Sequence, residues 1–118
     1  MPNKNPAYLQ ALAVDIRPAT AASNAVTVNA EAFSITTEAL TTAAGAEYAL
    51  TMTNNKVWVN SIILYSVWNW TNTQGTVACW QARNTDWSCV FSVTNTHASE
   101  ALNGTIKINW IILNPKWV

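Results

Sequence analysis

Few residues in this chain of 118 can take part in covalent chemistry, and they do not form a recognised catalytic arrangement. His97 is the single histidine, so an acid–base mechanism or a triad would have to use it with its neighbours Ser99 and Glu100. Three such residues in one short loop rarely face one another, and Ser99 lacks the Gly-x-Ser-x-Gly turn that presents a nucleophile. We expect His97 to bond the backbone of its own loop, and the protein not to be an enzyme.

The remaining polar groups do not predict a metal or cofactor site. The acidic residues are scattered, with no Asp-x-Asp run for calcium and no close pair for glycoside hydrolysis. Two cysteines with one histidine cannot complete a structural zinc site. We therefore expect no cofactor and no metal.

The two cysteines, Cys79 and Cys89, lie on strand-like segments that flank Arg83-Asn84-Thr85-Asp86. A hairpin centred on Asn84 would place the two thiols directly opposite each other, so that they could form a cross-strand disulfide in air. The alternative is two reduced, buried side chains, which synthesis in a cytoplasm favours. The same register places Trp87 on the core side with Cys79 and Cys89, and turns Trp80 away from the core.

Tryptophan is the one residue type whose pattern predicts binding. Exposed indole rings can anchor a protein interface or stack on sugars or bases, while buried ones are ordinary core. We expect interface contacts from four of the residues between 58 and 87, namely Trp58, Trp68, Trp70 and Trp80.

Composition narrows the choice of partner. Charged residues make up 10 % of the chain and the formal net charge is zero, so the sequence predicts no nucleic-acid partner and no anionic membrane partner. Low charge combined with seven tryptophans favours association, and we expect a homo-oligomer, a dimer or a trimer. No run approaches the roughly 18 apolar residues of a membrane span, and the N-terminus lacks the apolar region of a signal peptide. We expect synthesis in a host cytoplasm.

Alternating apolar residues separated by turn residues predict an all-β protein, an antiparallel β-sandwich or jelly-roll-like domain over residues 26–118. A change of phase predicts a β-bulge near residues 30–32. The third strand is apolar on both faces, so it is expected to be central or to lie at a subunit interface. Six strands are expected, at about 26–37, 46–53, 57–68, 76–82, 87–95 and 105–113.

Residues 1–25 differ in composition and predict an extended N-terminal arm, because three prolines surround one apolar patch. The patch spans Tyr8 to Val14, with Tyr8, Leu9 and Leu12 as its contact residues. It would form two helical turns or an added strand, and Pro18 would break either. The arm would latch subunits together; the alternative is a frayed terminus.

A corner before the last strand combines an apolar residue with a turn. Leu102 is expected to plug the core from its loop, and Asn103-Gly104 to supply positive φ angles.

Two segments resemble a family of small β-rich structural proteins of tailed bacteriophages. The first, within residues 34–54, contains Thr-Thr-Ala-Ala-Gly and Tyr-Ala-Leu-Thr-Met-Thr-Asn; the second, within residues 93–109, contains Asn-Thr-His-Ala-Ser-Glu-Ala-Leu-Asn-Gly-Thr. The resemblance spans residues 26–113, and this chain departs from the family pattern in its Trp-rich stretch, residues 58–87.

The resemblance implies a virion protein on the capsid surface, of the decoration or cement type, whose partner is the major capsid protein. A tail or fibre component that binds a carbohydrate or host receptor is the alternative. On either interpretation the scaffold acts through contacts and not through a catalytic centre.

Overall fold

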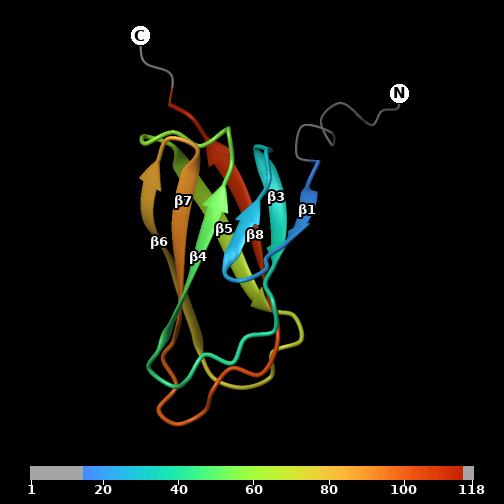
Figure 1. Cartoon of the computed structure of the whole chain (residues 1–118), viewed down its shortest axis with the longest axis vertical. Coiled ribbons are helices and arrows are strands. Elements are labelled where there is room, and N and C mark those ends of the chain that lie inside the picture. The colour runs from blue at the N-terminus through green and yellow to red at the C-terminus, as the bar shows by residue number, and fades with distance from the viewer. Residues whose placement is uncertain (1–14, 116–118) are drawn as a thin grey trace, which may run out of the picture.

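The computed structural model describes residues 15–115 and places two four-stranded sheets face to face (Figure 1). One sheet has the strand order β1-β3-β8-β5 and the other β2-β4-β7-β6. The strands are β1 (Arg17–Thr20), β2 (Ala25–Thr27), β3 (Ala32–Thr36), β4 (Glu47–Thr53), β5 (Ile62–Asn69), β6 (Val77–Thr85), β7 (Ser88–Asn95) and β8 (Ile106–Leu113). The predicted all-β sandwich is confirmed, while the jelly-roll description stays a prediction.

The core lies between the sheets because alternate residues of the central strands are apolar and point inward. Strand β8 shows this most clearly, since its even-numbered residues are buried and its odd-numbered ones are not. Trp110 of β8 is 1 % exposed and lies between Phe33 and Phe91, with ring centroids 5.2 and 4.8 Å away. Removing a buried aromatic residue of this kind costs about 3–5 kcal/mol.

The predicted first strand, residues 26–37, is in fact two strands that belong to different sheets. Strand β2 pairs with β4, whereas β3 pairs with β8, so the chain crosses the sandwich between residues 27 and 32. The change of phase that predicted a bulge near residues 30–32 marks this crossing. Val26 and Phe33 both point into the core, each from its own sheet.

The sandwich begins before residue 26, where the arm was expected to end. Strand β1 pairs in parallel with β3 and contains Pro18, which the edge position of β1 tolerates. A turn with positive φ at Ser23 and Asn24 then leads into β2, which pairs in parallel with β4. The sandwich therefore has two parallel pairings at one side, and the remaining pairings are antiparallel. The predicted patch Tyr8–Val14 lies outside the described residues.

The third predicted strand is apolar on both faces, as expected, but it starts later than predicted and lies at an edge of its sheet and not in the centre. Its place at a subunit interface stays a prediction. Residues 57–61 form turns, and β5 is an edge strand with a mostly exposed surface. Val57 is fully buried, whereas Trp58 and Val59 are exposed in the turn. The apolar character of this stretch thus has two origins, core residues such as Val57 and Ile63 and an exposed outer surface.

The corner before β8 has the predicted buried leucine but not the predicted positive φ angles. Leu102 is 2 % exposed and fills the end of the core. Neither Asn103 nor Gly104 has a positive φ, so that part of the prediction is wrong. Glycine is needed at 104 because a Cβ there would lie 2.7 Å from the backbone of Thr71.

Candidate interaction surface

The tryptophans that the sequence singled out are all exposed, but the fold does not bring them together. Trp58, Trp68, Trp70 and Trp80 are 55, 47, 50 and 46 % exposed. Trp68 and Trp70 lie at the end of β5, Trp80 lies on the outer face of β6, and Trp58 lies in the turn before β5. The structure therefore separates the four predicted contact residues into three places.

Trp87 was placed on the core side by the predicted hairpin register, and this is wrong. It occupies the β6–β7 turn with φ of 72° and is 61 % exposed. Its backbone N–H donates to the Val57 carbonyl oxygen over 2.7 Å, so its turn packs beside the one that carries Trp58. Two exposed indoles therefore share one end of the sandwich.

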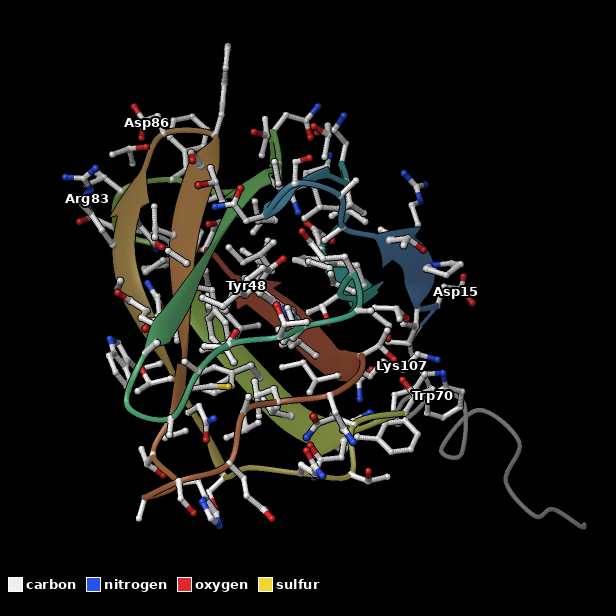
Figure 2. The ribbon with its side chains drawn as sticks, turned by 60° about the horizontal axis from the view of Figure 1, so that its bottom comes forward. Asp15, Tyr48, Trp70, Arg83, Asp86 and Lys107 are labelled. Carbon is white, nitrogen blue, oxygen red and sulfur yellow. The ribbon has the colours of Figure 1, made fainter. Side chains whose placement is uncertain are left out.

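Trp68, Trp70 and Lys107 form a cluster at the opposite end of β5. Figure 2 shows Trp70 beside Lys107. The two indoles meet edge to face, with centroids 4.9 Å apart and planes inclined by 74°. The Lys107 ammonium lies 4.0 Å from the Trp70 ring centroid and 6.0 Å from that of Trp68. Such cation–π contacts stabilise by about 0.5–1 kcal/mol at an exposed site. Sequence reasoning missed Lys107 because its cross-strand pairing with Trp68 depends on the β5–β8 register.

A rigid turn fixes the position of Trp70. The backbone N–H groups of Trp70, Thr71 and Asn72 all lie 3.1 Å from the carbonyl oxygen of Thr105 and donate to it. The Thr71 and Thr105 hydroxyls lie 2.8 Å apart and share a hydrogen bond. The indole of Trp70 is therefore presented by an ordered backbone, which reduces the entropy lost on binding.

The outer face of the sheet β1-β3-β8-β5 carries an apolar patch that the sequence pattern did not identify as a single surface. Opposed residues on β5 and β8 form two aliphatic pairs, Ile62 with Leu113 and Leu64 with Ile111. Ile16 lines the same shallow depression as Leu64 and Ile111 and is 45 % exposed. These residues came from three separate runs, so only the sheet order could reveal the patch.

A groove of about 420 Å³ runs along the open side of the sandwich between the edges of β5 and β6. Tyr65 and Trp68 line it from one sheet, and Val77 and Cys79 line it from the other. The Tyr65 hydroxyl donates to the Cys79 carbonyl oxygen over 3.0 Å and links the two edges. The groove has no charged lining residue, so it fits neutral surfaces better than ions.

The ring of His97 bonds within its own loop in the described part of the chain. Nδ1 of His97 accepts backbone N–H groups of Ser99 and Glu100 over 3.0 and 2.9 Å, as the sequence predicted. Nε2 of His97 lies 3.6 Å from a carboxylate oxygen of Glu100. Among residues 15–115 no three histidine, cysteine or acidic side chains are close enough to hold a metal ion.

The predicted pairing of Cys79 with Cys89 is wrong, because the hairpin turn lies further along the chain than expected. Cys79 faces Val93 and Cys89 faces Asn84, with a register shift between Gln81 and Arg83. Both thiols are free, and burial raises the pKa of each to about 12. The register thus excludes the direct cross-strand pair, while the reduced state of the two cysteines stays a prediction. Trp80 points outward, opposite to Cys79, as predicted.

Comparison of the chain with protein-family models, with curated proteins and with solved structures finds no match. Among the described residues, no helix is long and apolar enough to cross a membrane. Function must therefore be argued from the exposed surface itself.

Proposed function

We propose that this protein is a non-enzymatic structural component of a virion, a decoration or cement protein that binds the outer capsid shell. The observation that carries the proposal is the exposure of five tryptophans on an ordered sandwich, each between 46 and 61 % exposed. Tryptophan is enriched among the residues that dominate the energy of protein interfaces. The resemblance of residues 26–113 to structural proteins of tailed bacteriophages supplies the virion part of the proposal.

The mechanism on this proposal is burial of neutral surface. A specific interface buries about 800 Å² on each partner, and contacts of that size repeated over a shell stabilise the assembled state by mass action. The formal net charge of zero fits such a role, because association then depends little on salt. The outer face around Trp80 adds small neutral side chains such as Ala49 and Thr51.

The decisive experiment is the copy number of this chain relative to the major capsid protein in purified particles, by quantitative mass spectrometry. A shell-covering protein should be present in hundreds of copies. A few dozen copies or fewer would indicate the tail or a fibre, and complete absence would refute the virion assignment.

A contact variant tests which surface binds. Trp80→Ala should weaken binding to undecorated particles without changing the midpoint of thermal unfolding, because this indole lies outside the core. Trp110→Ala is the matched control for a core tryptophan and should lower the midpoint strongly. Unchanged particle binding by Trp80→Ala would remove this face from the proposal.

The alternative is a tail or fibre module that binds carbohydrate, and the groove beside Trp68 is the observation that favours it. Sugar rings stack on free aromatic faces. Titration with host glycans should quench tryptophan fluorescence on this alternative, and Trp68→Ala should abolish the quenching. Glycans that leave the fluorescence unchanged would exclude it.

A further inference from the structure

The sandwich has four edge strands, and three of them carry a feature that hinders pairing with another chain. Strand β1 has four residues and contains Pro18, and β2 has only three residues. Strand β6 has a register shift between Gln81 and Arg83, next to a charged side chain. Short length, proline, charge and bulges are the usual means by which proteins block edge pairing.

Strand β5 has none of these protections. It is eight residues long, pairs regularly with β8 throughout, and contains no proline and no charged residue. One of its edges is bonded to β8, and no hydrogen bond from the described residues reaches the backbone of residues 62–69 on the other side. Because alternate residues of an antiparallel strand direct their backbone groups to each side, about half of the N–H and C=O groups of β5 are open to a second strand.

We infer that two copies of this chain pair through β5, antiparallel across a twofold axis, so that the sheet β1-β3-β8-β5 continues into the same sheet of the second copy. The strand is neutral, so self-pairing brings no like charges together. The inference stands apart from the capsid assignment, because it concerns only the contact between two copies of the chain.

The pleat restricts the register of such a pair. Ile63 is buried and Tyr65 packs against Phe91, whereas Leu64 and Trp68 point outward. Opposed residues must share a face, so the axis passes through a residue and not between two residues. The two axes that pair the most residues of β5 pass through Tyr65 and through Ser66. With the axis through Tyr65, Ile62 of one copy faces Trp68 of the other. With the axis through Ser66, Leu64 of one copy faces Trp68 of the other. Both place an aliphatic side chain against an indole that is now half exposed.

The size of the contact is typical of weak, reversible association. Eight residues of β5 span about 26 Å along the strand. The sandwich side is wider than the roughly 10 Å between its two sheets, because outer side chains add to it, so this side has a cross-section of roughly 400 Å². Protruding side chains add further accessible area, which brings the contact near the lower limit of about 600 Å² per partner for specific association. We therefore expect a reversible dimer that dissociates in the micromolar range.

The test is sedimentation velocity of the full chain from about 1 to about 300 µM, a range that covers an interface of this size. The mass should rise from 12.9 kDa toward twice that value with concentration. Leu64→Lys on β5 should raise the dissociation constant at least tenfold, and the control Thr20→Lys, at an exposed position of β1 on the opposite edge of the same sheet, should leave it unchanged. A monomer at every concentration would overturn the inference, and equal effects of both variants would replace edge pairing by packing of the whole face.

Crosslinking tests the strand itself. Ser66→Cys should give a covalent dimer with a short bis-maleimide, while Thr20→Cys on β1 should not, although both positions are exposed. The native thiols react slowly near neutral pH because burial raises their pKa. If Ser66→Cys crosslinks only when mixed with a Leu12→Cys chain, the N-terminal segment occupies the edge and the β5 pairing is wrong.

Discussion

Gly104 offers the sharpest test of how the corner before β8 is built. A Cβ at this position would lie 2.7 Å from both the carbonyl carbon and the carbonyl oxygen of Thr71, and 2.8 Å from the backbone nitrogen of Asn72. These are backbone atoms that hydrogen bonds to Thr105 hold in place, so they cannot move aside without breaking the turn that presents Trp70.

The expected cost follows from this geometry. Overpacking a well-filled site destabilises by about 1–3 kcal/mol. Unfolding entropy near 2.1 cal/mol/K per residue gives about 250 cal/mol/K for a chain of 118 residues, so each kcal/mol lowers the midpoint by about 4 °C. Gly104→Ala should therefore lower the midpoint of thermal unfolding by about 4–12 °C, measured by circular dichroism.

An asparagine variant distinguishes the two reasons why a position can require glycine, which are a positive φ and the close approach of other atoms. Asparagine tolerates positive φ better than alanine, but it is larger. At Gly45 φ is +78° and no heavy atom lies within 4 Å of the place that a Cβ would take, so Asn should cost less than Ala there. At Gly104 the order should be reversed. A Gly104→Asn protein more stable than Gly104→Ala would show that a positive φ, and not close approach, governs the corner.

Three further predictions concern side chains with unusual surroundings. Both cysteine thiols have a pKa near 9 in the unfolded chain and of about 12 in the folded one. Because the unfolded thiols ionise first, the free energy of unfolding should fall as pH rises from about 9 to about 12. Alanine at both positions should flatten this part of a pH series of melting temperatures. Lys107→Ala should destabilise by no more than about 1 kcal/mol while increasing acrylamide quenching of Trp70, and unchanged quenching would contradict the cation–π contact. Burial raises the pKa of Glu38, but the hydrogen bonds from Tyr48 and from backbone N–H groups outweigh this effect and hold the pKa below 4.5. The stabilisation by the Glu38 carboxylate should therefore be lost as pH falls below that value. Tyr48→Phe should reduce this loss, as measured by urea unfolding at pH 3 and pH 7.

The strands could be predicted where alternation was strict, as in β4, β7 and β8, because one inward face leaves a period of two in the sequence. The pairing of strands could not be predicted with the same success. The hairpin register failed because the turn contains Trp87 in a left-handed conformation, which a bulky residue rarely adopts. One displaced turn then moved Cys89 from opposite Cys79 to opposite Asn84.

The candidate surface was only partly predictable for a related reason. Exposure of Trp80 followed from local alternation. The Lys107 contact and the patch around Leu64 and Ile111 depend on which strands are neighbours. In the case of β5 and β8, that order joins residues 37 to 51 positions apart in the sequence. A single sequence contains no direct signal for such pairings.

The position of β8 has a consequence for how the protein is made. This strand lies between β3 and β5, and it is the last of the described strands in the chain. While a ribosome is still adding residues 106–113, β3 and β5 are complete but have no partner that links them, so the apolar strand β5 is exposed on both edges. The first sheet can therefore close only after synthesis has passed Leu113, and a nascent chain that stalls before that point leaves an aggregation-prone strand in solution. Chaperone capture of the growing chain should then peak just before β8 emerges from the exit tunnel.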